Sequence, residues 1–343
     1  MKNVFKACLL FLLAGVVLVG CSTANNGSKE VQKIAIAYHP HYPGLAPALV
    51  AQEQGFFKDE NLEAELVQFT AGPPELAAMA SGDINFGFLG PGAHIFVMEG
   101  KGKVLVSSYN SLENDILVAK ESGIKTMQDL KGKTIGITDG TAYELMLNLA
   151  LEKAGMSRAD VKTANLDEAG KLTAFSAGKI DAVSTSATYS AEIRNKMGEE
   201  NVISLMTPEA FLPDNRFLNS WIVEPKFLEK NEEVTIRFLR AMLRGIDYQL
   251  NHEEETINSV AKFLNQDADS LRKQIERIDM LSVADNEQAF ADGSVLTWYD
   301  NLIKMNINAG FLDEAKFVSS EKYVDVDVFK KAIESLKKDG LLK

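Results

Sequence analysis

The most informative stretch is LAAMASGDIN, residues 76–85, because residues 172–181 (LTAFSAGKID) follow the same pattern 96 positions later. Each copy predicts a helix that ends at a glycine, Gly82 or Gly178, followed by a buried strand. A single helix–glycine–strand unit is common, but two copies at this spacing favour two lobes built on one plan. One sheet that uses the same turn twice is the alternative interpretation.

Strand and helix patterns alternate around these copies, which predicts an α/β protein. The expected strands are residues 31–38, 62–69, 84–89, 103–109, 115–120 and 134–138. The expected helices are residues 45–54, 75–81 and 142–154, and long amphipathic helices follow at 233–251, 254–264, 287–309 and 326–338. The chain therefore changes, after about residue 225, from alternating elements to mostly helix.

Five loops follow expected strands and are candidates for a binding site. They are residues 38–44, 70–72, 90–92, 139–143 and 185–188. Ligands of open α/β sheets bind outside the carboxyl ends of the parallel strands, which is where such loops lie. If two lobes face each other, these loops line one cleft.

The start of the chain has the features of a bacterial lipoprotein signal. Two lysines precede an apolar run, residues 9–19, that is too short to span a bilayer comfortably. The run closes on Leu-Val-Gly-Cys at residues 18–21, which resembles a lipobox. We therefore expect a signal peptide at residues 1–20, lipidation of Cys21, and a flexible polar tether at residues 21–30. The folded part is expected outside the cytoplasm, anchored to the cell membrane through its lipid.

Composition and motifs argue against several classes of protein. The formal net charge is −12, which disfavours nucleic acid as a partner and a basic membrane-binding surface. The cysteines are Cys8, within the expected signal, and Cys21, so the folded part is expected to have no disulfide and no catalytic thiol. No motif of a serine hydrolase, a zinc peptidase or a phosphate-binding loop occurs. We expect neither enzymatic activity nor a cofactor.

Several short motifs in series resemble one family. They are the runs at residues 51–57 (AQEQGFF), 69–88 (FTAGPPELAAMASGDINFGF), 129–133 (DLKGK) and 178–182 (GKIDA), together with the helix over residues 147–155. Over roughly residues 31–250 the chain resembles the binding proteins of aliphatic-sulfonate, taurine and nitrate ABC importers.

This resemblance implies the type II periplasmic-binding fold, with two α/β lobes and a two-strand hinge. Lobe one is expected at residues 31–111 plus 219–343, and lobe two at residues 112–218. The hinge strands are expected near residues 107–114 and 216–223. The resemblance also implies that a monomer binds a small solute between its lobes. Closure about the hinge would present the closed form to the permease and ATPase subunits of an ABC importer.

The chain departs from the sulfonate-type pattern in three places. Residues 90–94 (GPGAH) stand where an acidic residue and two prolines are typical. Residues 186–189 (SATY) replace a typical Trp-Asp-Pro-Tyr run, and Lys171 and Leu172 lie near the position of an arginine. A sulfonate- or taurine-like anion is the favoured solute. A neutral or zwitterionic heterocycle, such as a pyrimidine precursor of thiamine, is the alternative.

Two predicted helix starts face the expected cleft. Helix starts carry unpaired backbone N–H groups and a partial positive charge, which suit an anion. One start follows residues 90–92 (GPG), where glycine lets the backbone approach a ligand closely. The other begins at Thr141, where Thr141 and Glu144 also form a capping box that serves only the helix itself.

Histidines and aromatic side chains gather in the same loops. His39, His41 and His94 fall there, and we expect no metal, because acidic residues do not cluster with them and soft ligands are absent. The loop motifs contain no Lys or Arg, so an anion would rest on N–H groups, hydroxyls and histidines. The expected ligand-binding residues are Tyr38, His39, His41, Tyr42, Thr70, Ala71, Gly72, Gly90, Pro91, Gly92, Tyr109, Asn110, Asp139, Gly140, Thr141, Ala142, Tyr143, Thr185, Ala187, Thr188 and Trp221.

Two other classes of function compete with a transport receptor. Pyrimidine synthases of thiamine biosynthesis resemble this fold, but they carry a Cys-rich motif that is absent from this chain. A lipoprotein that senses or adheres without transport is the third class, and permease genes beside the gene for this chain would argue against it.

Overall fold

The computed structural model describes residues 30–212 and 215–342. Residues 31–343 form one compact unit. The expected signal peptide, the lipidation site Cys21 and nearly all of the expected tether lie outside the described residues. Within the described ranges, no helix is long and apolar enough to cross a membrane.

The first sheet has six strands in the order β11-β4-β10-β3-β1-β2. Their bounds are Gln32–Tyr38 (β1), Leu62–Gln68 (β2), Phe86–Leu89 (β3), Lys103–Ser111 (β4), Leu218–Val223 (β10) and Ile278–Met280 (β11). β1 lies parallel to β2 and to β3, whereas β10 runs antiparallel between β3 and β4. The three parallel strands therefore end at the same edge of the sheet.

The second sheet has five strands in the order β7-β6-β8-β5-β9. Their bounds are Asn114–Ala119 (β5), Thr134–Ile137 (β6), Lys162–Asn165 (β7), Ala182–Ser186 (β8) and Val202–Met206 (β9). β6 is parallel to β7 and β8, and β5 runs antiparallel between β8 and β9. The two sheets confirm the two-lobe α/β prediction, and the single-sheet alternative is wrong.

The last residue of each copy of the sequence pattern makes the same pair of hydrogen bonds in its own sheet. Asn85 brackets Ala35 of β1: its side-chain Oδ1 accepts from the Ala35 N–H at 2.8 Å, and its own N–H donates to the Ala35 carbonyl at 2.9 Å. Asp181 brackets Thr134 of β6 in the same way, with both bonds at 2.8 Å. Each copy therefore ends by joining its new strand to the first parallel strand of its own sheet.

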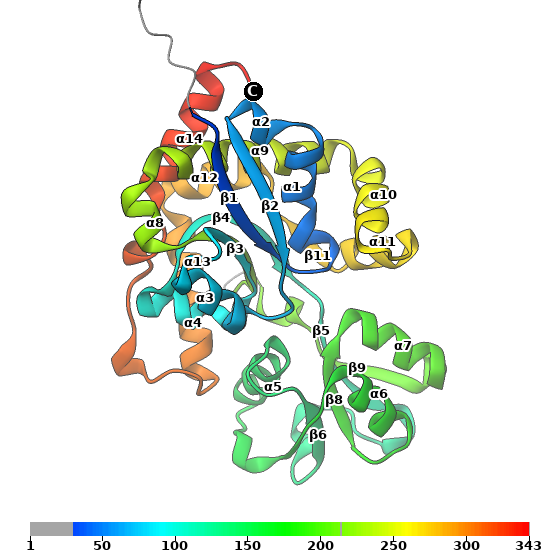
Figure 1. Cartoon of the computed structure of the whole chain (residues 1–343). Coiled ribbons are helices and arrows are strands. Elements are labelled where there is room, and N and C mark those ends of the chain that lie inside the picture. Colours follow the sequence, from blue (N-terminus) through cyan, green and yellow to red (C-terminus); the bar gives the residue numbers. More distant parts are fainter. Residues whose placement is uncertain (1–29, 213–214, 343) are drawn as a thin grey trace, which may run out of the picture. The chain divides into compact units, whose positions relative to one another are not determined.

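Among the residues that the structure describes, fourteen α-helices connect or cover the sheets. Their bounds are Tyr42–Glu53 (α1), Phe56–Asp59 (α2), Gly72–Ser81 (α3), His94–Phe96 (α4), Ala142–Lys153 (α5), Glu168–Ser176 (α6), Ala187–Met197 (α7), Pro225–Lys230 (α8), Glu232–Asn251 (α9), Glu253–Leu264 (α10), Ala268–Ile275 (α11), Val283–Asp292 (α12), Ser294–Asn308 (α13) and Val326–Lys338 (α14). Figure 1 shows α1, α9 and α14 on the side of the molecule that holds the first sheet. The helices after residue 225 thus pack mainly on that sheet.

The long helix α9 anchors the core of the first sheet. Its buried face includes Val234, Phe238 and Met242, which recur every four residues and so lie on one stripe of the helix. The Phe238 ring stacks on Phe86 of β3, with ring centroids 3.6 Å apart. These residues belong to the largest apolar cluster, which also contains Ile34 and Ile36 of β1 and Leu105 of β4.

Two expected helices differ from the structure. The helix expected over residues 287–309 is two helices, α12 and α13, because Gly293 between them has a φ of 81° that ends one helix and begins the next. The helix expected after residues 90–92 is broken into short pieces: a 3₁₀ turn over Pro91–Ala93, three residues of α4, and a π turn over Val97–Lys101. The second difference bears directly on the candidate site.

The bracketing bonds give a prediction about stability. Asn85→Ala and Asp181→Ala each leave a backbone N–H of the sheet without its acceptor, so each should lower the free energy of unfolding by about 1–3 kcal/mol in chemical denaturation. Asn85→Asp and Asp181→Asn exchange the residues of the two copies and keep an oxygen acceptor. Both exchanges should be closer to wild type than the alanine variants, and equal losses for all four variants would contradict the role of the bracket.

Candidate functional site

A pocket of ≈ 460 Å³ lies where loops of the two sheets come together. Its lining includes the segments that follow β1, β2 and β3 of the first sheet and those that follow β6 and β8 of the second. Further lining residues come from the end of β4, the segment that joins it to β5, the strand β10 and the helix α11. The pocket therefore sits at the carboxyl ends of the parallel strands of both sheets, and its volume is in the range of sites for small organic ligands.

The first wall contains a histidine held by a buried carboxylate. His39 Nε2 donates to Glu75 Oε2 at 2.9 Å, and the other oxygen of Glu75 accepts from the Phe88 N–H at 2.7 Å. Burial raises the pKa of Glu75, and the bonds from His39 and Phe88 oppose that rise. The site is possible only because residue 87 is glycine, since a Cβ there would lie 2.1 Å from Glu75 Oε1.

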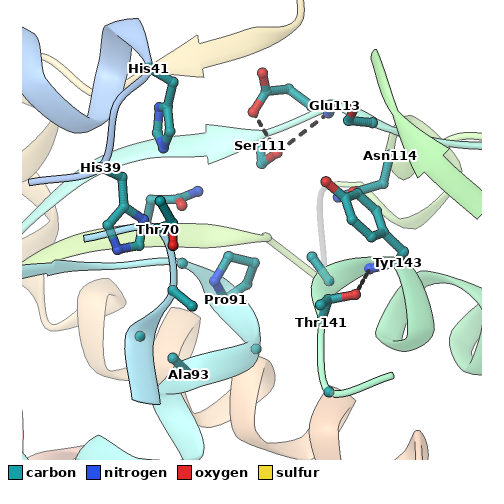
Figure 2. Close-up of a pocket in the computed structure, with 18 of the residues that line it drawn as sticks. His39, His41, Thr70, Pro91, Ala93, Ser111, Glu113, Asn114, Thr141 and Tyr143 are labelled. Carbon is teal, nitrogen blue, oxygen red and sulfur yellow. Dashed lines mark hydrogen bonds between the residues drawn. The ribbon is translucent and has the colours of Figure 1, made fainter. Parts of the chain in front are cut away.

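A second histidine on this wall begins the helix α1. His41 Nδ1 accepts from the Gly44 N–H at 3.2 Å, so in the neutral ring Nε2 carries the proton. Burial, together with the neighbouring His39, lowers the pKa of His41 to about 3. His41 is therefore neutral at physiological pH and can supply a hydrogen-bond donor but no charge. Figure 2 shows both histidines on the side of the pocket that carries Thr70.

The second wall is the start of α5. Thr141 caps this helix by accepting from the Tyr143 N–H at 3.3 Å, and its hydroxyl donates to the Thr138 carbonyl at 2.6 Å. Glu144 accepts from the N–H of Gly140 at 2.8 Å and not from Thr141, so the expected capping box is shifted by one residue. The cap is thus satisfied within the loop itself.

The ring of Tyr143 separates the pocket from a buried lysine. Lys171 Nζ lies 3.9 Å from the centre of the Tyr143 ring. It donates to the Ser184 carbonyl at 2.9 Å and pairs with Glu168 at 3.3 Å. Burial lowers the pKa of Lys171, and Glu168 opposes that shift. Lys171 does not line the pocket.

Other lining residues come from the end of β4, from the short segment that leads to β5 and from β10. Tyr109, Ser111, Glu113 and Asn114 line the pocket there, and Asn219 lies opposite Gly90. Glu113 is half-buried, and a hydrogen bond of 3.4 Å joins its Oε2 to Ser111. Burial raises the pKa of Glu113 to about 7, against the lowering effects of Ser111 and Arg277. No lysine or arginine is among the described residues that line the pocket.

The structure brings many of the expected ligand-binding residues to this pocket. Those that line it are His39, His41, Thr70, Ala71, Gly72, Gly90, Pro91, Gly92, Tyr109, Gly140, Thr141, Ala142, Tyr143 and Thr188. Those that do not are Tyr38, Tyr42, Asn110, Asp139, Thr185, Ala187 and Trp221. The second group lies on, or close after, the same strands as the first, so proximity in sequence did not decide which side chain faces the pocket.

Several of the expected residues that do not line the pocket are buried inside the protein. The Trp221 side chain is fully buried and packs edge-on against Phe88, so the expectation that it faces the cleft is wrong. Asn110 is also buried, and its Oδ1 accepts from the Phe217 N–H at 2.7 Å. Thr185 donates to Glu168 at 2.6 Å. For Asn110 and Thr185, the alternation of the strand turns the side chain away from its neighbours that line the pocket. Trp221 lies two residues beyond the lining residue Asn219 and pairs with Phe88 within the sheet.

His94 also lies away from the pocket. Its side chain is buried, with Nε2 3.3 Å from the Ser220 hydroxyl and its ring against Tyr299, and burial lowers its pKa to about 3. The broken helix that begins at Pro91 turns it inward, so the expectation of His94 in a cleft loop is wrong. Among the described residues, no group of three or more His, Cys, Asp or Glu could hold a metal ion.

Other lining residues were not expected from the sequence. They are Pro73, Ala93, Phe96, Ser111, Glu113, Asn114, Ser186, Asn219 and Gln274. Glu113 and Asn114 had a usable signal, since both lie within the segment expected to form a hinge strand. Gln274 had none, because it arrives from α11, far along the chain, where its Oε1 accepts from the Tyr42 N–H at 3.0 Å.

Comparisons with known proteins agree with this geometry. A family model described as "NMT1/THI5 like" matches residues 42–256, so the chain belongs to that family. A Brucella abortus protein named as a binding protein is 29% identical over 279 residues, 81% of this chain and 86% of the relative. A Haemophilus influenzae protein named for thiamine biosynthesis is 28% identical over 268 residues, 76% of this chain and 82% of the relative.

A solved structure shows the same fold. The periplasmic aliphatic sulphonate binding protein SsuA of Escherichia coli aligns with a TM-score of 0.64 and 22% identity, covering 86% of this chain and 91% of that chain. This likeness shows the fold alone. The chain therefore has the two-lobe fold of periplasmic binding proteins, as the sequence predicted.

The contact between Gly87 and Glu75 gives a second prediction. Gly87→Ala forces the Glu75 carboxylate from its two hydrogen bonds, so the free energy of unfolding should fall by about 1–3 kcal/mol. The matched control is Gly136→Ala in the second sheet, where the closest atom to the added methyl group is the terminal Cδ1 of Ile180, at 2.6 Å, and no hydrogen-bonded group is displaced. Gly136→Ala should cost less in the same denaturation experiment, and the reverse order would contradict the account.

Proposed function

We propose that this protein is a solute receptor of an ABC importer, which holds a small organic molecule between its two sheets. The observation that carries this proposal is the pocket itself, with polar side chains and aromatic rings contributed by both sheets. Such a site is complete only when the two groups of loops are together. A solute that contacts both therefore favours the closed arrangement over an open one.

The proposed hinge lies where the chain passes between the sheets. The chain leaves the first sheet after β4 and enters the second at β5, and it returns between β9 and β10. We propose residues 31–111 plus 219–343 as lobe one and residues 112–218 as lobe two, as the resemblance implies. The lobes would close about these two crossing segments, and the permease and ATPase subunits would recognise the closed form of the monomeric receptor.

The relatives suggest two classes of solute. The Escherichia coli protein is named for sulphonates, and the Haemophilus influenzae relative is named for thiamine biosynthesis. A sulfonate in this pocket would depend on hydroxyls, amides, backbone N–H groups and neutral His41, because no described lysine or arginine lines it. The aromatic and amide lining suits a neutral or zwitterionic ring compound at least as well. An enzyme on this fold is the competing proposal, and the names of the binding-protein relatives favour a receptor over it.

A melting screen of the mature protein tests the receptor proposal. At a free concentration about 100 times its Kd, a ligand that binds only the folded state should stabilise it by about 2.7 kcal/mol and raise Tm. The panel should hold sulfonates, taurine, nitrate, amino acids and pyrimidines. If no compound in the panel raises Tm, the result counts against the proposal.

A variant within the pocket controls for binding elsewhere. The Cβ of a residue at position 92 would lie 3.7 Å from the backbone of Thr141 and Ala142 on the opposite wall. Gly92→Leu should therefore fill the space between the walls and abolish the shift, whereas Gly92→Ala makes only an ordinary contact and should keep it. The cooperative melting of each variant shows whether it is folded.

We also propose that Cys21 carries the lipid anchor and that the protein works outside the cytoplasm. The residues around Cys21 support this, since an apolar segment ends there in a lipobox-like sequence followed by small polar residues. The fold begins at Gln32, so the anchor would be joined to it by a short tether.

Metabolic labelling with an alkyne fatty acid tests the anchor. The wild-type protein should take up the label, and Cys21→Ala should not, because the acylated thiol is gone. Cys8→Ala is the matched control and should remain labelled, since Cys8 lies in the part that is removed. Equal labelling of wild type and Cys21→Ala would refute the assignment.

A further inference from the structure

The carboxyl group of Glu113 stands out among the lining residues. It lies on the segment between β4 and β5, which the chain uses to pass from one sheet to the other. Figure 2 shows Glu113 with Ser111 on the side of the pocket away from Thr70, near Asn114 and Tyr143. Ser111 reaches Oε2, and among the described residues no hydrogen bond to Oε1 is found. One oxygen is therefore open to a ligand.

The cations near this carboxylate are engaged elsewhere. Arg277 binds the two oxygens of Asp115 at 2.9 and 3.3 Å and the Leu112 carbonyl at 2.6 Å. Lys171 is held by Glu168 and Ser184 behind the Tyr143 ring. A half-buried carboxylate without its own cation is costly, so a ligand that neutralises or hydrogen-bonds it gains free energy on binding.

The neighbours of Glu113 define the rest of this subsite. Tyr109 on β4 and Tyr143 on α5 are its electrostatic neighbours, and burial raises the pKa of each hydroxyl above its usual value. Both tyrosines are therefore neutral at physiological pH. Their hydroxyls can donate or accept, and their rings supply flat walls for a ligand.

We propose that Glu113 selects solutes with an N–H donor, such as an amine, an amidine or an amino-substituted ring, over solutes that offer only an anionic group. The ligand nitrogen would donate to the open oxygen of Glu113, with Tyr109 and Tyr143 in the same part of the lining. This inference rests on the proposed receptor function and deepens it. A sulfonate without an amine finds in the same place a carboxylate that repels it as soon as it is ionised.

The preference should depend on pH in a defined direction. Glu113 is neutral below about pH 7 and ionised above it, so an amine should bind more tightly as the pH rises from 6 to 8 and a plain sulfonate less tightly. The ionised fraction rises about tenfold over this range, which sets the scale of the change in Kd. The other charged or titratable groups facing Glu113 are Tyr109, Tyr143 and Arg277 with its partner Asp115, and His39 and His41 line the opposite wall.

The test uses pairs of probes of the same shape. Taurine is compared with propane-1-sulfonate, in which a methyl group replaces the amine, and an aminopyrimidine with the corresponding methylpyrimidine. The wild-type protein should prefer the amine of each pair by about 10- to 100-fold in Kd, as expected for a hydrogen bond to a charged group. Glu113→Gln should lose most of that preference and all of the dependence on pH between 6 and 8.

The control variant is Glu209→Gln. Glu209 is exposed, carries the same charge and influences the same guanidinium of Arg277, but it does not line the pocket. It should leave both the preference and the pH profile unchanged. If neither amine binds better than its partner, or if Glu113→Gln keeps the preference and the pH profile, the assignment of Glu113 is overturned. The broader melting screen decides separately whether the receptor proposal also fails.

Discussion

The site depends on one constraint: the chain passes between its two sheets, and the parallel strands of both sheets end toward the same pocket. In the first sheet, β1 lies between its parallel neighbours β2 and β3, and the antiparallel strand β10 lies next to β3. In the second sheet, β6 lies between its parallel neighbours β7 and β8, and the antiparallel strand β5 lies next to β8. The antiparallel strands β10 and β5 adjoin the passages between the sheets. Polar residues at these places are buried and bind other parts of the chain: Asn110 accepts from the Phe217 N–H, and Asp115 pairs with Arg277.

The distribution of charge follows from the same arrangement. The protein is acidic overall, and neither the buried Lys171 nor the partly buried Arg277 lines the pocket. Lys171 and Arg277 are paired with carboxylates on the second sheet or next to it. Pairing satisfies these charges, and it leaves hydroxyls, amides, neutral histidines and Glu113 to meet a ligand. The specificity of such a site comes from hydrogen bonds and from aromatic surface more than from net charge.

Sequence reasoning located the loops more reliably than the side chains within them. Thr70, Gly90 and Thr141 line the pocket, because the loops at the carboxyl ends of parallel strands all lie at the same edge of their sheet. The prediction for Asn110 was wrong because successive side chains of a strand alternate between faces, and its neighbours Tyr109 and Ser111 face the pocket. The prediction for Trp221 was wrong because this residue lies within the sheet, where it packs against Phe88. The prediction for His94 was wrong because the helix after Pro91 is broken, which turns the His94 ring into the core.

The sequence by itself determined the alternation of strands and helices, the two copies of one unit, and the loops that follow the strands, because periodicity and glycine positions act over a few residues. Only the tertiary structure decided that Gln274 joins the pocket from α11, that Lys171 is withdrawn behind Tyr143, and that Glu113 lacks a cation of its own. These outcomes depend on segments far apart in the chain that meet only after the sheets have formed. The charge state and hydrogen bonding of a side chain are set by those neighbours, which no local pattern records.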